Sequence, residues 1–257
     1  MSPAALRAEW TKFRTVAGPS WLLAGVVAVT VSAGVAAASV ARCQSATCGI
    51  DPATVSFTGI GPGQAVIAVA GVLAIGNEYS TGMIKLSLTA MPRRLTWFCA
   101  KAAVLTAPVL AASALAVAGA ALAGRLILPG HGFTPAHGYA SLTSATDVRA
   151  AVGAVLYLTL IALLSLGLAA AVRDSAAAIG LVLGVLYLFP LAADVISNPP
   201  LTRHLDQIGP LPAGLDAQAT TGLRALPLTP WQGLGVLAVW AAGALLAGGL
   251  LLQLRDA

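Results

Sequence analysis

The chain has 257 residues, of which 58% are hydrophobic and only 9% are charged, and its formal net charge is +5. Soluble domains carry about 25% charged residues, which they spread over their surfaces. The composition therefore excludes an ordinary soluble domain and predicts a polytopic membrane protein. Because lipid offers the backbone no hydrogen-bond partners, its spans are expected to be α-helices. The predicted fold class is all-α, with residues 1–257 forming one transmembrane domain.

Residues 1–18 predict a helix that lies in the membrane interface. Ser2 fits the N-cap and Pro3 fits the first helical position. Apolar side chains then recur at helical spacing, and basic side chains occupy the other side. The apolar set is Leu6, Trp10, Phe13 and Ala17, and the basic set is Arg7, Lys12 and Arg14. The alternative is a positive flank that only orients the first span.

Six apolar blocks follow, each near the ~20 residues that a helix needs to cross the hydrocarbon core. They comprise residues 21–41, 55–75, 102–124, 150–172, 176–196 and 231–254. The second block is the weakest, because the glycines and the proline in its 59–63 stretch disrupt a helix. Regular helix is therefore expected to begin near Gln64 and to continue past Ile75.

Lysine and arginine are distributed unevenly between the two sides of this topology. If the N-terminus is cytoplasmic, nine of the 14 basic residues lie on that side and the other five lie outside. The cytoplasmic set is Arg7, Lys12, Arg14, Lys85, Arg93, Arg94, Lys101, Arg173 and Arg255. An excess of basic residues in short loops marks the cytoplasmic side of a membrane protein. We therefore expect a multi-pass protein of the cell membrane with both termini in the cytoplasm.

Two of the outer connections contain residues that predict local structure: a cysteine pair in one and short helices in the other. The first contains Cys43 and Cys48, which on an oxidising side either form a small local disulfide or remain two free thiols. The longest, residues 198–230, is rich in proline but keeps apolar residues, which indicates short helices at the outer face.

The sequence offers no catalytic or metal-binding constellation. His131 and His137 lack a carboxylate or thiolate at a supporting spacing, so we expect no metal site. Almost no ionisable residue lies within the spans, which argues against an ion-coupled carrier and against an intramembrane hydrolase. No G-x-x-x-x-G-K-S/T phosphate loop occurs. We therefore expect no enzymatic activity, no cofactor in this chain and no nucleic-acid partner.

Residues 77–95, which join the second and third spans, are the most informative segment. Apolar residues from Met83 to Leu88 repeat at helical spacing with Lys85 on another side, which predicts a short amphipathic helix along the cytoplasmic face. Arg93 and Lys101 are explained by the excess of basic residues at that face. Glu78 is not, because it is an acid on the positive side of the membrane. This pattern suggests a docking surface for a soluble partner.

The segment also resembles the signature of a known family. Its residues are similar to the E…T-G…L…P-x-R…K signature of type-2 ATP-binding-cassette (ABC) exporter permeases. The matching residues are Gly76-Asn77-Glu78-Tyr79, Thr81-Gly82, Leu86, Leu88, Pro92-Arg93-Arg94 and Lys101. The one departure is Arg93, since members often have Ser or Asn before the second arginine. The predicted topology, with a long outer connection before the sixth span, fits the same family.

The resemblance implies the membrane-spanning subunit of an ATP-driven exporter. Such a subunit acts as a dimer, with itself or with a homologous permease, above separate ATPase subunits that bind ATP and Mg. The 77–95 segment would then be a coupling helix, with Glu78, Tyr79, Thr81, Gly82 and Lys85 facing the ATPase. Membrane lipid would contact three basic anchors, Arg93, Arg94 and Lys101. Two alternatives stay open: a non-transporting membrane anchor that recruits a soluble partner, and an ion-coupled secondary transporter.

Overall fold

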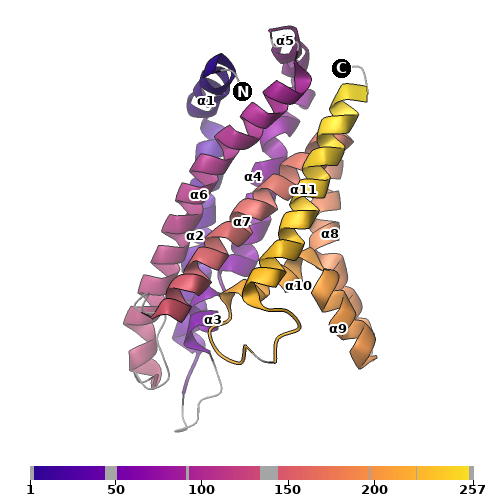
Figure 1. The fold of residues 1–257 in the computed structure, drawn as a ribbon. Helices are drawn as coiled ribbons and strands as arrows, with labels where there is room; N and C mark the ends of the chain where they lie inside the picture. The colour runs from indigo at the N-terminus through magenta and orange to yellow at the C-terminus, as the bar shows by residue number, and fades with distance from the viewer. Residues whose placement is uncertain are drawn as a thin grey trace.

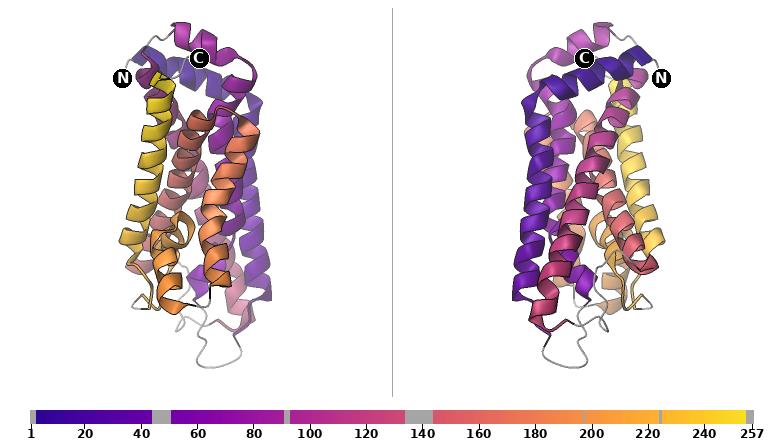
Figure 2. Two further views of the ribbon diagram at one scale, coloured as in Figure 1. Left: turned by 90° about the vertical axis from the view of Figure 1, so that its right-hand side faces the viewer. Right: turned by 90° about the vertical axis from the view of Figure 1, so that its left-hand side faces the viewer.

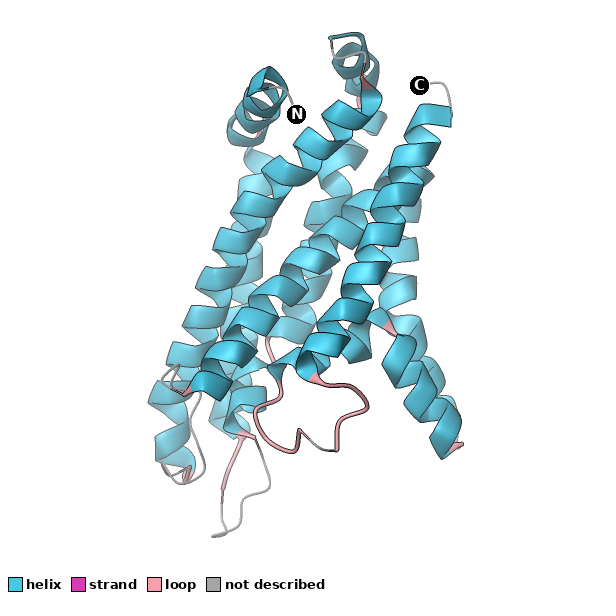
Figure 3. Cartoon of the chain, in the orientation of Figure 1, coloured by secondary structure: helices cyan, strands magenta, loops and turns pink. Residues whose placement is uncertain are grey.

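The computed structural model describes residues 3–43, 51–90, 93–133, 144–196, 198–223 and 225–254. Over these residues the chain is helical, with short connections and no strand (Figure 3). The predicted all-α fold class is therefore confirmed for the described part of the chain.

Six helical segments are long and apolar enough to cross a membrane, as predicted. Four are single helices, namely α2 (Ala17–Val40), α7 (Ala145–Val172), α8 (Ser175–Val195) and α11 (Pro230–Leu254). The second span joins the short α3 (Pro52–Phe57) to α4 (Ile60–Ser80), and the third joins α6 (Arg94–Ile127) to the short η1 (Leu128–His131). The direction in which they cross the membrane stays a prediction.

Regular helix α4 of the second span begins earlier than predicted, at Ile60 rather than near Gln64. Pro62 is tolerated because it lies in the first turn of α4, where a backbone N–H has no partner within the helix. Gly59 and Gly63 have a packing role, since a Cβ on either would overlap Thr30 of α2. The other predicted limit is confirmed: α4 continues past Ile75 to Ser80.

The α7 helix lies among the other spans and packs most extensively against α11 and α4 (Figure 1). Glycine permits the close approach of α7 and α11. A Cβ on Gly167 would overlap the backbone of Ala244, and a Cβ on Gly248 would lie 2.5 Å from the carbonyl oxygen of Gly167. Small residues allow such backbone contact between membrane helices. The α2 and α8 helices are the least buried of the six spans.

Short helices gather at the two ends of the bundle (Figure 1). At one end, termed the α1/α5 end, lie α1 (Pro3–Thr15), α5 (Met83–Ala90) and the end of α11. The α1 helix crosses this end of the bundle before the chain turns into α2 (Figure 2). At the other end, termed the α9/α10 end, lie α3, η1 (Leu128–His131), α9 (Pro199–Ile208), α10 (Pro210–Leu215) and η3 (Asp216–Gln218).

Candidate functional site

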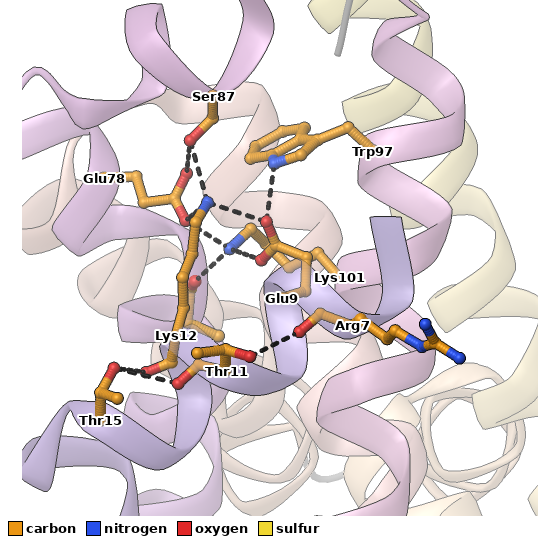
Figure 4. Close-up of polar contacts among 10 residues, drawn as sticks. Arg7, Glu9, Thr11, Lys12, Thr15, Glu78, Ser87, Trp97 and Lys101 are labelled. Carbon is orange, nitrogen blue, oxygen red and sulfur yellow. Dashed lines mark hydrogen bonds and ion pairs between the residues drawn. The ribbon is translucent and has the colours of Figure 1, made fainter. Parts of the chain in front are cut away.

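The side chain of Glu78 lies in a buried cluster of charges at the α1/α5 end (Figure 4). Lys101 of α6 donates from Nζ to Oε1 of Glu78 at 2.7 Å and to Oε2 of Glu9 at 2.8 Å. A third bond, of 3.2 Å, runs to the carbonyl oxygen of Ala74 on α4. One ammonium thus joins α1, α4 and α6 at a single point.

Lys12 is the second cation of the cluster. Its Nζ donates to Oε1 of Glu9 at 2.8 Å, to Oε1 of Glu78 at 3.3 Å and to Oγ of Ser87 at 3.0 Å. The Ser87 hydroxyl donates in turn to Oε2 of Glu78 at 3.2 Å, and Trp97 Nε1 donates to Oε1 of Glu9 at 3.1 Å. We call the six residues Glu9, Lys12, Glu78, Ser87, Trp97 and Lys101 the charge junction.

The charge junction balances two carboxylates against two ammonium groups. Buried ions are tolerated only when they are paired and hydrogen-bonded, and these are both. Burial alone would raise the pKa of Glu9, but the attraction and hydrogen bonds of Lys101 and Lys12 outweigh it and hold that pKa below its ordinary value. Burial would likewise lower the pKa of Lys12, but Glu9 and Glu78 raise it. Glu9 and Lys12 are therefore charged near neutral pH.

The α1 helix turns two of its charged side chains, Glu9 and Lys12, toward the bundle, whereas Arg7 and Arg14 are exposed. Glu9 and Lys12 are three residues apart and share a face with the buried Ala5. The neighbouring face carries Trp10, which is 43% exposed and stacks on Phe13 with ring centroids 6.1 Å apart. An exposed Trp10 stacked on a half-buried Phe13, on a basic helix, is the arrangement expected of a helix at the lipid interface.

The five residues expected to face an ATPase divide into two groups. Glu78 is buried in the charge junction, and Tyr79 is half-buried, with Arg173 6.0 Å from its ring centroid. Thr81, Gly82 and Lys85 are exposed at the α1/α5 end. Gly82 has a φ of 70°, a left-handed conformation that suits glycine and turns the chain from α4 into α5. The docking role of the whole set stays a prediction.

The three predicted headgroup anchors also lie in different surroundings. Arg93 is exposed, as an anchor would be. Arg94 donates from Nη1 to the carbonyl oxygen of Leu252 at 2.8 Å and so binds the last turn of α11. Lys101 is only 6% exposed, and the anchor role of all three residues stays a prediction. The ammonium of Lys101 is directed inward because Glu9 and Glu78 would otherwise be buried with one cation fewer.

Glu9, Ser87 and Trp97 are the members of the junction that the sequence patterns did not single out. The helical pattern of α1 directs attention to its apolar side chains, and Lys12 was grouped with its polar side. The signal that marked Glu78, an acid among bases at one membrane face, applies equally to Glu9. Partners from helices far apart in the chain cannot be assigned from spacing alone.

The remaining predicted sites are only partly described. Cys43 is disulfide-bonded. Cys48 and His137 lie outside the described residues, so the predicted pairing of Cys43 with Cys48 stays a prediction. The backbone N–H of Cys43 donates to the carbonyl oxygen of His131 at 3.0 Å. Among the described residues, no group of three or more His, Cys, Asp or Glu side chains is placed to hold a metal ion.

Comparison with known proteins assigns no family, because no family model matches the chain and no curated protein matches it either.

Proposed function

We propose that the chain is the membrane-spanning subunit of an ATP-driven exporter. It is not itself an enzyme; separate ATPase subunits bind ATP and Mg and dock at the α1/α5 end. The observation that carries the proposal is the short helix α5, which stands beyond the spans and leaves an apolar and basic face uncovered. The resemblance of residues 76–101 to type-2 ABC exporter permeases supports the same function.

The exposed face of α5 is unlike an ordinary soluble surface. Met83 is 45% exposed and Leu86 is 70% exposed, with the exposed Lys85 between them. The opposite face packs inward through Ile84 and Ser87, which are buried. Uncovered apolar side chains beside a charge mark a surface that binds a partner. An ATPase subunit of matching apolar and acidic character would cover this face.

The attachment of α5 to α4 explains how closure of the ATPase would be coupled to movement of the permease. It continues from α4 through the Gly82 turn, and Ser87 binds Glu78 from the other side. A docked ATPase that closes on ATP would displace α5 and, through Glu78, the end of α4. Glu78 thus transmits the movement from inside the protein, while Thr81, Gly82 and Lys85 meet the partner.

A second permease would complete the translocation pathway, and α8 offers a face for it. Gly180 and Gly184 lie one turn apart on α8, and a Cβ on either would meet no neighbouring atom. The apolar side chains of Leu188 and Leu191 continue the same exposed side. Open glycines let another helix approach closely, as in dimers of membrane helices.

Co-purification from the native membrane in mild detergent tests the proposal. We expect a nucleotide-binding subunit to accompany the wild-type chain and to be lost from Leu86→Asp. The matched control is Leu223→Asp, which changes a leucine that is 38% exposed at the α9/α10 end and should keep the subunit. A non-ATPase partner would favour the membrane anchor. Recovery of the chain alone, with activity that follows an ion gradient, would favour the secondary transporter.

A further inference from the structure

The two lysines of the charge junction are held differently. Lys101 has a side chain that is 7% exposed and bonds of 2.7 and 2.8 Å to Glu78 and Glu9. Lys12 has a side chain that is 32% exposed, and its bond to Glu78 is longer, at 3.3 Å. Water can replace the bonds of Lys12 at little cost, whereas separation of Lys101 from its carboxylates would leave buried charges unpaired.

The looser lysine makes one of the two side-chain hydrogen bonds to α5, and Glu78 makes the other. Among the hydrogen bonds of the described residues, Ser87 of α5 accepts from Lys12 and donates to Glu78. Figure 4 shows Ser87 above these two side chains, on the edge of the junction away from Lys101. Any movement of α5 away from the bundle must therefore break the contacts of Ser87 first, while those of Lys101 can persist.

We infer that Lys12 and Ser87 form a latch that holds α5 against α1 in the resting permease, and that Lys101, Glu9 and Glu78 form a fixed joint behind it. Lys12 and Ser87 are then positioning residues for the coupling step. The α1 helix, which no feature of the sequence connects with coupling, sets the resting position of α5. This inference rests on the proposed function only for the cause of the movement, not for the existence of the latch.

Spin-label distance measurements on the permease alone, in lipid nanodiscs, test the latch. Labels at Thr11 of α1 and Thr89 of α5, both exposed, are introduced with Cys99 replaced by Ser. Loss of the latch bonds should shift the ratio of released to latched α5 about 5- to 30-fold. We expect Lys12→Met and Ser87→Ala to broaden or lengthen the 11–89 distance, and Lys12→Arg to keep the wild-type distribution.

Two controls separate the latch from a general loosening of the fold. A second label pair, at Thr11 and the exposed Leu95 of α6, should keep its distance in every variant because the fixed joint is intact. Thr15→Val removes an exposed α1 hydroxyl that bonds only within its own helix, and should leave both distances unchanged. Unchanged 11–89 distances in Lys12→Met and Ser87→Ala would overturn the latch.

The complex with the ATPase then tests the cause of the movement. Trapping with ATP and vanadate should convert the wild-type 11–89 distance to that of the released variants, and the basal ATPase rate of Lys12→Met should exceed that of wild type. A trapped complex with the resting distance would overturn the coupling role while leaving the latch in place. If no ATPase binds at all, the proposed function fails, and the distances in the permease alone still decide the latch.

Discussion

The two ends of the bundle are held together by different kinds of contact. At the α1/α5 end, the side chains of the charge junction bond one another across four elements, α1, α4, α5 and α6. At the α9/α10 end, charged side chains bond the backbone of loops. Asp51, which caps α3, accepts from the backbone N–H groups of Thr220 and Thr221 at 2.9 and 3.1 Å. Arg149 donates to the carbonyl oxygens of Ala217 and Ala219.

This difference indicates where the protein can move. A side chain in a network can exchange one partner for another, so an element bound through it can shift without leaving a backbone group unpaired. A loop whose backbone is bound by a carboxylate has no such exchange available, because the N–H groups would lose their acceptor. We therefore expect movement at the α1/α5 end and a fixed arrangement at the α9/α10 end.

The largest expected effect is at the fixed joint. Lys101→Met leaves Glu9 and Glu78 with Lys12 as their single cation, and a buried charge without its partner costs about 3–5 kcal/mol. We expect a clear loss of thermal stability in detergent and of folded protein in the membrane. Lys85→Met, which removes an exposed lysine at the same end, is the control and should be nearly neutral. Equal stability of the two variants would contradict a structural junction.

The second largest effect on stability is expected at the α9/α10 end. Asp51→Ala removes the acceptor for Thr220, Thr221 and the N–H of Ala53 in α3. Hydrogen bonds to a charged group contribute about 1.5–3 kcal/mol. Hydrogen exchange should therefore accelerate over residues 216–223 and α3. Protection of α1 and α5 should not change, since no described bond links Asp51 to them.

The two ends should also respond differently to pH. Burial and the charge of Asp206 raise the pKa of Asp216 to about 6, and burial with the charge of Asp194 raises that of Asp206. The folded state then keeps protons that the unfolded state releases, so stability falls as the pH rises from about 4 to about 6. At the α1/α5 end the lowered pKa of Glu9 places the loss of stability at lower pH, as the pH falls through that pKa.

Hydrogen exchange at pH 5 and pH 7, corrected for the intrinsic rate, measures this difference. Residues 205–218 should be less protected at pH 7, and Asp216→Asn should remove the dependence. Protection of α1 should be the same at both values. A pH-dependent change in protection that is confined to α1 would contradict the expectation that the α9/α10 end is the one that responds between pH 5 and pH 7.

The smallest expected effect is at the end of α11. Arg94 binds the carbonyl oxygen of Leu252, where a cation complements the negative end of the helix dipole. Such an interaction contributes about 0.3–1 kcal/mol, so Arg94→Met should fray the last turn of α11 with little loss of global stability. Exchange of the Leu251 and Leu252 amides reports the fraying. Arg93→Met, at the exposed neighbour, should leave these amides unchanged.

The spans and the short helix after the second one could be predicted because local patterns determine them. Apolar runs of membrane length and the helical spacing of apolar residues from Met83 to Leu88 are visible in nearby residues. The start of α4 at Ile60 could not be predicted, because Gly59 and Gly63 disfavour a helix in isolation and are accommodated only by contact with Thr30. The close approach of α2 therefore determines where α4 begins, and the low helix propensity of glycine does not.

The charge junction shows the same limit for the candidate site. Glu78 stood out as an acid among bases, but its partners Glu9, Lys12 and Lys101 come from helices far away in the sequence. Spacing along one helix cannot pair them, and it gave no sign that Lys101 would bond to Glu9 and Glu78. Of the five residues expected to face the ATPase, those that lie outside the charge junction and remain exposed to a partner are Thr81, Gly82 and Lys85.

Photo-crosslinking from position 86 tests the docking surface most directly. With a photoreactive amino acid in place of Leu86, which is 70% exposed on α5, we expect a crosslink to a nucleotide-binding subunit in the native membrane. The same probe in place of Leu223 at the α9/α10 end should give none. Crosslinks from position 86 only to lipid, or to a protein that binds no nucleotide, would contradict an ATPase docking site at the α1/α5 end.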